Sequence, residues 1–110
     1  MGTLSIFPFK SIINTFISQV GDGAADHSQW TRVEDMDIAR PSYKIDSSNP
    51  GSDLAGETSA ALTAASIAFA DSDPDYSAEL MEHAKELFDF ADQFQGKYSD
   101  SVSAASSFYK

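Results

Sequence analysis

Residues 73–96, "DPDYSAELMEHAKELFDFADQFQG", carry the pattern that most restricts the fold of this chain. Apolar side chains recur there every three or four positions, which places them on one face of an α-helix. That face consists of Tyr76, Leu80, Ala84, Leu87, Phe88, Ala91 and Phe94. The opposite face is largely charged, through Asp75, Glu79, Glu82, Lys85, Glu86 and Asp89. The stretch therefore predicts a long amphipathic helix that packs one side against a neighbour.

Both ends of this helix carry boundary signals. Asp73 is a suitable N-cap. Pro74 suits the first helical position, because the backbone N–H that proline lacks would have no hydrogen-bond partner there. Gly96 follows the last periodic residue, where a left-handed glycine commonly ends a helix.

The preceding stretch, "SDLAGETSAALTAASIAFA", is rich in alanine and predicts a helix from Asp53 to Ala70. Ser52 or Asp53 is expected to cap it, and Glu57 suits the positive end of the helix dipole. Its predicted apolar face consists of Leu54, Ala61, Leu62, Ala65 and Phe69. Since only "DSD" joins the two helices, we expect an antiparallel hairpin. The small residues around the first helix indicate further close neighbours, as in a slice of a larger all-α body.

The first half of the chain is less regular. Residues 3–18 show helical spacing from Lys10 onward, whereas residues 21–51 lose all periodicity and predict one long loop. Loops of that length in a compact domain are usually functional or disordered. The apolar N-terminal segment does not match a signal peptide, because Lys10 lies inside it and Pro8 interrupts it.

The composition excludes several classes of function. Seventeen acidic residues against seven basic ones give a net charge of −10, which repels nucleic acid and anionic membrane surfaces. The absence of cysteine excludes disulfides, thiolate metal sites and a thiol nucleophile. A chain of 110 residues is long enough for a single small domain.

Two patterns that resemble metal sites have plainer interpretations. Asp71, Asp73, Asp75 and Glu82 have the spacing of calcium ligands in an EF-hand, but Tyr76 stands where its sharp turn needs glycine. Helix capping accounts for this cluster. His83 follows Glu79 by one helical turn and is interpreted as a surface histidine. We therefore predict no metal site in this chain.

The segment "GDGAADHSQWTRVEDM", residues 21–36, offers richer chemistry. An aromatic ring beside hydrogen-bonding groups of both signs suits a sugar, whose C–H faces stack and whose hydroxyls form hydrogen bonds. The residues concerned are Asp26, His27, Trp30, Arg32, Glu34 and Asp35. In the alternative, Trp30 anchors the loop in a core and the charges are merely solvated. We favour ion pairing over sugar contact for Arg32, Glu34, Asp35 and Arg40.

Several consecutive motifs resemble glycoside hydrolase family 9, the inverting endo-β-1,4-glucanases. They are "QVGDGAADHSQWTRVEDM", "ARPSYKIDSSNPGSDLAGETSAALTAASIAF", "DPDYSAELMEHAKELFDFADQFQGKYSDSV" and the final "FY". The resemblance runs from Gln19 to Tyr109, which divides the chain into an atypical segment 1–18 and a catalytic-domain fragment 19–110. It implies part of an (α/α)6 barrel, in which the helical hairpin belongs to the barrel and the long loop lines a glucan cleft.

The resemblance also implies roles for individual residues. His27, Trp30 and Tyr109 correspond to residues that bind the glucan chain in the family. In the family, an Asp motif provides the general base and a distant Glu provides the general acid. Neither is found here, so we assign no catalytic residue and expect this chain alone to be inactive.

Val33 stands where relatives usually have proline. Calcium, which many relatives bind just after the "FY" motif, is expected only in a longer parent protein.

The sequence thus predicts a fragment of an extracellular cellulase that contributes cleft residues to the binding of a β-1,4-glucan. A non-catalytic helical binding module is the alternative. No cofactor, nucleic acid or membrane partner is expected.

Overall fold

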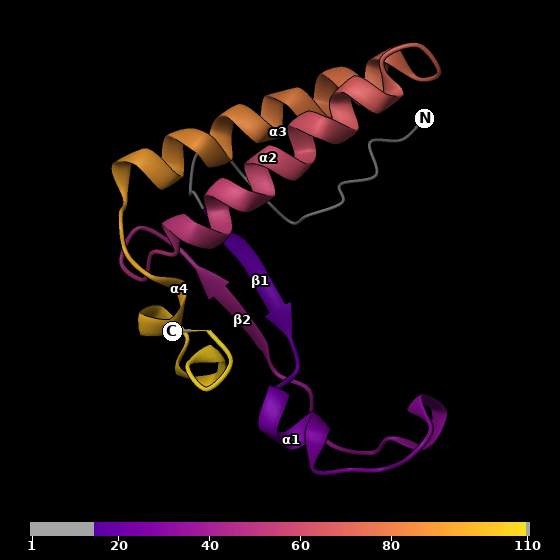
Figure 1. Ribbon diagram of the computed structural model, residues 1–110, viewed down its shortest axis with the longest axis vertical. Coiled ribbons are helices and arrows are strands. Elements are labelled where there is room, and N and C mark those ends of the chain that lie inside the picture. Colours follow the sequence, from indigo (N-terminus) through magenta and orange to yellow (C-terminus); the bar gives the residue numbers. More distant parts are fainter. Residues whose placement is uncertain (1–14, 110) are drawn as a thin grey trace.

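The computed structural model describes residues 15–109, which form a helical hairpin, a small sheet and a short helical C-terminal segment (Figure 1). In chain order the elements are β1 (Phe16–Val20), α1 (Gly23–His27), the 3₁₀ helix η1 (Val33–Asp35), β2 (Ser42–Ile45), α2 (Ser52–Phe69), α3 (Pro74–Gln93), α4 (Tyr98–Ser101) and the 3₁₀ helix η2 (Ser103–Ala105). None of the helices in this part of the chain is long and apolar enough to cross a membrane.

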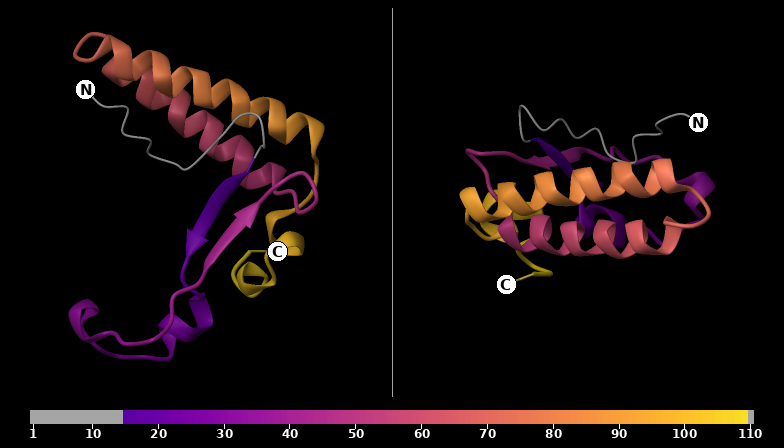
Figure 2. Two further views of the ribbon diagram at one scale, coloured as in Figure 1. Left: turned by 180° about the vertical axis from the view of Figure 1, so that it is seen from behind. Right: turned by 90° about the horizontal axis from the view of Figure 1, so that it is seen from above.

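The predicted hairpin is confirmed, since α2 and α3 lie antiparallel along their whole length (Figures 1 and 2). The start of α3 is also as predicted. Asp73 accepts a hydrogen bond from the Tyr76 N–H at 3.1 Å, and Pro74 occupies the first turn. This cap satisfies one of the helix's otherwise unpaired N–H groups.

Two other cap predictions are wrong. Gly51 is the N-cap of α2 and no side chain caps that helix, because Ser52 and Asp53 make tertiary contacts instead. The Ser52 hydroxyl donates to the Gly96 carbonyl at 3.1 Å, and Asp53 accepts from the Tyr98 N–H at 2.9 Å. Gly96 does not have a positive φ; its role is steric, since a Cβ there would lie 2.7 Å from Cγ of Pro50.

The buried faces of the hairpin differ in part from the predicted ones. On α3, Leu80, Ala84 and Leu87 are buried as expected, but Phe90 is 2% exposed whereas Phe88 is 64% exposed. On α2 the buried residues are Ala55, Ser59, Leu62 and Ser66, while Ala61 and Phe69 are exposed. The spacing of apolar residues alone predicts the wrong buried face for α2, because this helix packs against α3 through serine as well as apolar side chains.

Serine hydroxyls join the two helices directly. Ser59 donates to the Ala84 carbonyl at 2.6 Å, deep in the interface. Ser66 and Ser77 donate to each other's carbonyl oxygens at 2.7 and 2.6 Å. Small side chains let the helices approach closely, and these bonds satisfy hydroxyls that would otherwise be costly to bury.

A two-stranded antiparallel sheet replaces part of the predicted helix and loop. β1 pairs with β2 with Phe16 opposite Ile45 and Val20 opposite Ser42, and the register is irregular between Ile17 and Gln19. The helix predicted for residues 3–18 is therefore wrong at its C-terminal end, and its remainder up to residue 14 lies outside the described residues. A short apolar run rich in β-branched residues does not distinguish helix from strand by periodicity.

The sheet completes the core of the described chain. Phe16 and Ile45 are buried with residues of both long helices and of the C-terminal segment. The full set is Phe16, Ile45, Ala55, Leu62, Leu80, Ala84, Leu87, Phe90, Tyr98, Val102 and Ala105. The described fold is thus mostly helical, as predicted, with a small sheet that the sequence patterns do not reveal.

Replacing Phe90 with alanine tests the position of the core. Phe90→Ala is expected to lower the free energy of unfolding by about 3–5 kcal/mol, because it removes a buried ring and leaves a cavity. Phe88→Ala on the same helix is the matched control, with an expected change within about 0.5 kcal/mol. Urea unfolding followed by circular dichroism measures both. Equal losses in the two variants would contradict the assigned face.

Candidate functional site

The connection between β1 and β2, residues 21–41, is held at its base by an ion pair. Arg40 Nη2 lies 2.7 Å from Asp26 Oδ2, its Nε donates to Asp26 Oδ1 at 3.3 Å, and Nη2 also reaches the Val20 carbonyl at 3.4 Å. We call this arrangement the Asp26–Arg40 clamp. The hydrogen bond to Asp26 and its negative charge raise the pKa of Arg40 still further, so this guanidinium stays charged.

Gly21 permits the clamp to form. Its φ is +99°, a conformation that side-chain-bearing residues rarely adopt, and its N–H donates to the Pro41 carbonyl at 2.7 Å. A Cβ on Gly21 would lie 2.5 Å from Arg40 Nη2. The loop is therefore closed by backbone and side-chain contacts at the same point.

Trp30 projects into solvent from the far end of this loop. It is fully exposed, with a relative accessibility of 103%, so the alternative in which it anchors the loop in a core is wrong. Its side chain lines a shallow depression together with Gln29, Thr31, Arg32 and Asp35. Arg32 donates from Nε to Asp35 at 2.9 Å, which confirms the ion-pairing role expected for these two residues.

His27 lies elsewhere, at the C-terminal end of α1. Its Nδ1 is 2.6 Å from the Gly23 carbonyl oxygen, and its ring centroid is 5.5 Å from that of Phe108. A cavity of about 210 Å³ is lined by Gln19, Gly23, His27, Ala104, Ala105, Phe108 and Tyr109. The structure therefore brings His27 and Tyr109 together, while Trp30 lines a different cavity.

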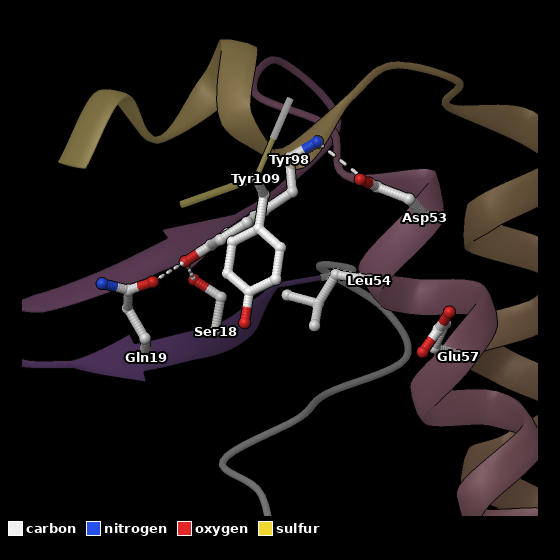
Figure 3. Close-up of a pocket in the computed structure, with 7 residues that line it drawn as sticks. All are labelled: Ser18, Gln19, Asp53, Leu54, Glu57, Tyr98 and Tyr109. Atoms are coloured by element: carbon white, nitrogen blue, oxygen red, sulfur yellow. Dashed lines mark hydrogen bonds between the residues drawn. The ribbon is translucent and has the colours of Figure 1, made fainter. Parts of the chain in front are cut away.

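Tyr109 also lines a larger cavity of about 360 Å³, which Figure 3 shows between the sheet and the start of α2. The other lining residues are Ser18, Gln19, Asp53, Leu54, Glu57 and Tyr98. Since Gln19 and Tyr109 line both cavities, the two form neighbouring parts of one recessed surface.

Tyr98 supports the wall of this larger cavity. Its hydroxyl hydrogen-bonds Gln19 Oε1 at 2.7 Å and Ser18 Oγ at 2.9 Å, and its N–H is held by Asp53 (Figure 3). Burial raises the pKa of Tyr98, and the Ser18 hydrogen bond opposes this rise in part. The phenol is therefore neutral, and its hydrogen bonds connect α4 to β1.

Sequence reasoning missed the carboxylates of this cavity as site candidates. Asp53 and Glu57 are four residues apart near the start of α2, so they lie on one helix face. That spacing is visible in the sequence, but only the fold shows that the face borders β1 and Tyr109.

Comparison with known proteins agrees with this geometry. The family model for glycosyl hydrolase family 9 matches residues 8–110. The chain belongs to this family. Endoglucanase 19 of Arabidopsis thaliana is 56% identical over 97 residues, which cover 88% of this chain and 16% of that protein. Endoglucanase 17 of Oryza sativa subsp. japonica is 58% identical over 92 residues, covering 84% of this chain and 18% of the relative.

Solved structures of family 9 enzymes have the same local fold. The endoglucanase of the termite Nasutitermes takasagoensis superimposes with a TM-score of 0.84 at 61% identity, covering 86% of this chain and 22% of that one. A cellulase of C. cellulolyticum in complex with cellobiose gives a TM-score of 0.72 at 31% identity, covering 84% and 27%. The family 9 chain described here thus spans only about a fifth of the curated and solved relatives it matches.

The remaining chemical motifs of this family 9 chain have structural roles. His83 lies on α3 with its Nδ1 3.5 Å from Glu86 and its Nε2 3.9 Å from Glu79, so the carboxylate neighbour is as expected. Its side chain is only 27% exposed, so it is less superficial than predicted. Asp73 caps α3, in agreement with the capping interpretation of the aspartate cluster. Residues 15–109 contain no group of three or more His, Asp or Glu placed to hold a metal ion.

Breaking the Asp26–Arg40 clamp should loosen the loop without unfolding the chain. Trp30 is the only tryptophan in the sequence, so its fluorescence anisotropy reports loop motion. Arg40→Gln is expected to lower this anisotropy while the urea midpoint changes little, because an exposed ion pair adds little to global stability. Lys44→Gln, which removes the same charge from β2, is the control. Unchanged anisotropy in Arg40→Gln would show that the clamp does not restrain the loop.

The Tyr98 hydroxyl should contribute to stability in a pH-dependent way. Because its pKa is raised in the folded state, its contribution is fully present below the unfolded pKa of about 10 and is lost as the pH rises through the raised pKa. Tyr98→Phe should cost about 0.5–1.5 kcal/mol at neutral pH and should flatten the alkaline decline in stability. Urea unfolding at neutral and alkaline pH, with Tyr76→Phe on α3 as control, measures this. An alkaline decline as steep in Tyr98→Phe as in the unsubstituted chain would refute it.

Proposed function

We propose that this chain forms part of the substrate cleft of an endo-β-1,4-glucanase that hydrolyses cellulose or a related glucan with inversion. The observation that carries the proposal is the full exposure of Trp30 on a loop closed by the Asp26–Arg40 clamp. An exposed tryptophan leaves a large apolar face in water, and stacking of a pyranose ring would cover it. Family membership and the endoglucanase relatives support a glucan as the ligand.

His27 and Tyr109 are the second part of the proposed cleft. They share one cavity, and their ring nitrogen and hydroxyl suit sugar hydroxyls, which both donate and accept hydrogen bonds. Cellobiose in the C. cellulolyticum relative is a ligand of the same chemical kind. The separation of Trp30 from this cavity suits an extended polymer, since a chain of several sugars reaches more than one contact point.

The hydrolytic step needs two carboxyl groups that this chain is not proposed to supply. Inverting glycosidases hold a general acid and a general base about 6.5–9.5 Å apart, with a water beside the base. From the resemblance to family 9 we expect a longer parent protein to supply both. Asp53 is not proposed for either role, because its Oδ1 accepts the Tyr98 N–H.

We further infer that α2 and α3 are neighbouring members of an (α/α)6 barrel. Support comes from the side chains they leave exposed: Ile67 on α2 is 72% exposed and Phe88 on α3 is 64% exposed. Further helices packed beside the hairpin would bury these groups and gain hydrophobic stabilisation.

An extracellular location follows from the proposed substrate, because a glucan polymer does not cross a membrane.

Glucan binding by the 110-residue chain tests this proposal. Isothermal titration calorimetry should detect cellotetraose, and Trp30→Ala should weaken its binding by about tenfold through loss of stacking. Phe88→Ala is the control for loss of an exposed aromatic ring and should leave the Kd unchanged. Equal affinity for maltotetraose, whose linkages are α-1,4, or unchanged binding by Trp30→Ala would argue against the proposed cleft.

A further inference from the structure

The hydrogen bond at His27 determines which nitrogen of its imidazole carries the proton. Nδ1 lies 2.6 Å from the Gly23 carbonyl oxygen, and a carbonyl oxygen can only accept. Nδ1 therefore carries the proton. In a neutral imidazole one nitrogen donates and the other accepts, so Nε2 of neutral His27 presents a lone pair.

Nε2 is also available. His27 is exposed, and within residues 15–109 no hydrogen bond to Nε2 is formed. The adjacent carboxylate of Asp26 does not compete, because both its oxygens bind Arg40. Nε2 thus has no protein partner in this part of the chain, and His27 lines the cavity that it shares with Tyr109.

Phe108 packs beside the imidazole ring of His27. The two ring centroids are 5.5 Å apart with a tilt of 32°, within the range of favourable aromatic contacts. The backbone of Phe108 is held just after η2, where its N–H donates to the Ala105 carbonyl at 3.0 Å. Gly23 makes room for this contact, because a Cβ there would lie 2.5 Å from Cε2 of Phe108.

We propose that Phe108 and Gly23 are positioning residues that keep His27 in its Nδ1–H form, so that Nε2 accepts a hydrogen bond from a glucan hydroxyl. The identity of the ligand rests on the proposed function, whereas the state of the imidazole does not. Phe108 and Gly23 act through His27 and need not contact the glucan. The inference assigns a direction to the hydrogen bond: the sugar donates and the protein accepts.

The first test reads the imidazole without any ligand. Long-range ¹H–¹⁵N correlation spectra of the ¹⁵N-labelled chain, recorded at mildly alkaline pH, distinguish a protonated from an unprotonated ring nitrogen. We expect His27 to be protonated at Nδ1 alone. A mixture of tautomers or protonation at Nε2 would overturn the proposal.

Matched variants test the two positioning residues in the same spectra. Phe108→Leu and Gly23→Ala should each convert His27 to a mixture of tautomers. Phe88→Leu removes an exposed ring elsewhere, and Gly56→Ala adds a methyl group where nothing lies within 4 Å, so both should leave His27 unchanged. If Phe108→Leu and Gly23→Ala also leave it unchanged, neither residue positions the ring.

The second test separates the two ring nitrogens by titration with cellotetraose. His27→Gln places an amide near the position of Nε2, whereas His27→Asn reaches only the position of Nδ1. Binding by His27→Asn should be about tenfold weaker than that of the unsubstituted chain, and His27→Gln should retain most of the affinity. Equal losses in both would overturn the acceptor role. Absence of any glucan binding by a chain with the expected tautomer would overturn the proposed function and leave the positioning of His27 established.

Discussion

The close contact between α2 and α3 supports everything else in the described chain. It depends on small side chains, and the hydroxyls of Ser59, Ser66 and Ser77 bond to carbonyl oxygens of the facing helix. The first turn of α2 then fixes the C-terminal segment, through Ser52 with Gly96 and Asp53 with Tyr98. The hairpin is therefore the scaffold to which the sheet and the site residues are attached.

Tyr98 connects the hairpin to the sheet. Its backbone is bound to α2 and its hydroxyl to Ser18 and Gln19 of β1, so one residue joins three elements. β1 in turn leads into Gly21 and the Asp26–Arg40 clamp, which closes the loop carrying Trp30. The proposed binding residues thus lie on loops, while the packed helices form the rigid part of the described chain, as is common for binding sites.

The strong negative charge is compatible with the proposed ligand. A net charge of −10 disfavours anionic partners but has no comparable effect on a neutral glucan. Recognition of such a ligand depends on stacking and on the direction of hydrogen bonds. In the proposed cleft, the exposed ring of Trp30 would provide the stacking surface, and the Gly23 carbonyl beside His27 would set the direction of one hydrogen bond.

The sequence by itself determined the two long helices, their antiparallel pairing and the cap at Asp73, because these depend on local periodicity and capping chemistry. It also indicated the family through its ordered motifs, including the segment around His27 and Trp30. Tertiary structure decided which faces are buried, so Phe90 rather than Phe88 lies in the core and Ser59 is used for packing. It also made residues 16–20 a strand. Ser52 and Asp53 form long-range hydrogen bonds instead of capping α2, and Phe108 lies beside His27. These outcomes depend on contacts between residues far apart in the chain, for which local spacing provides no signal.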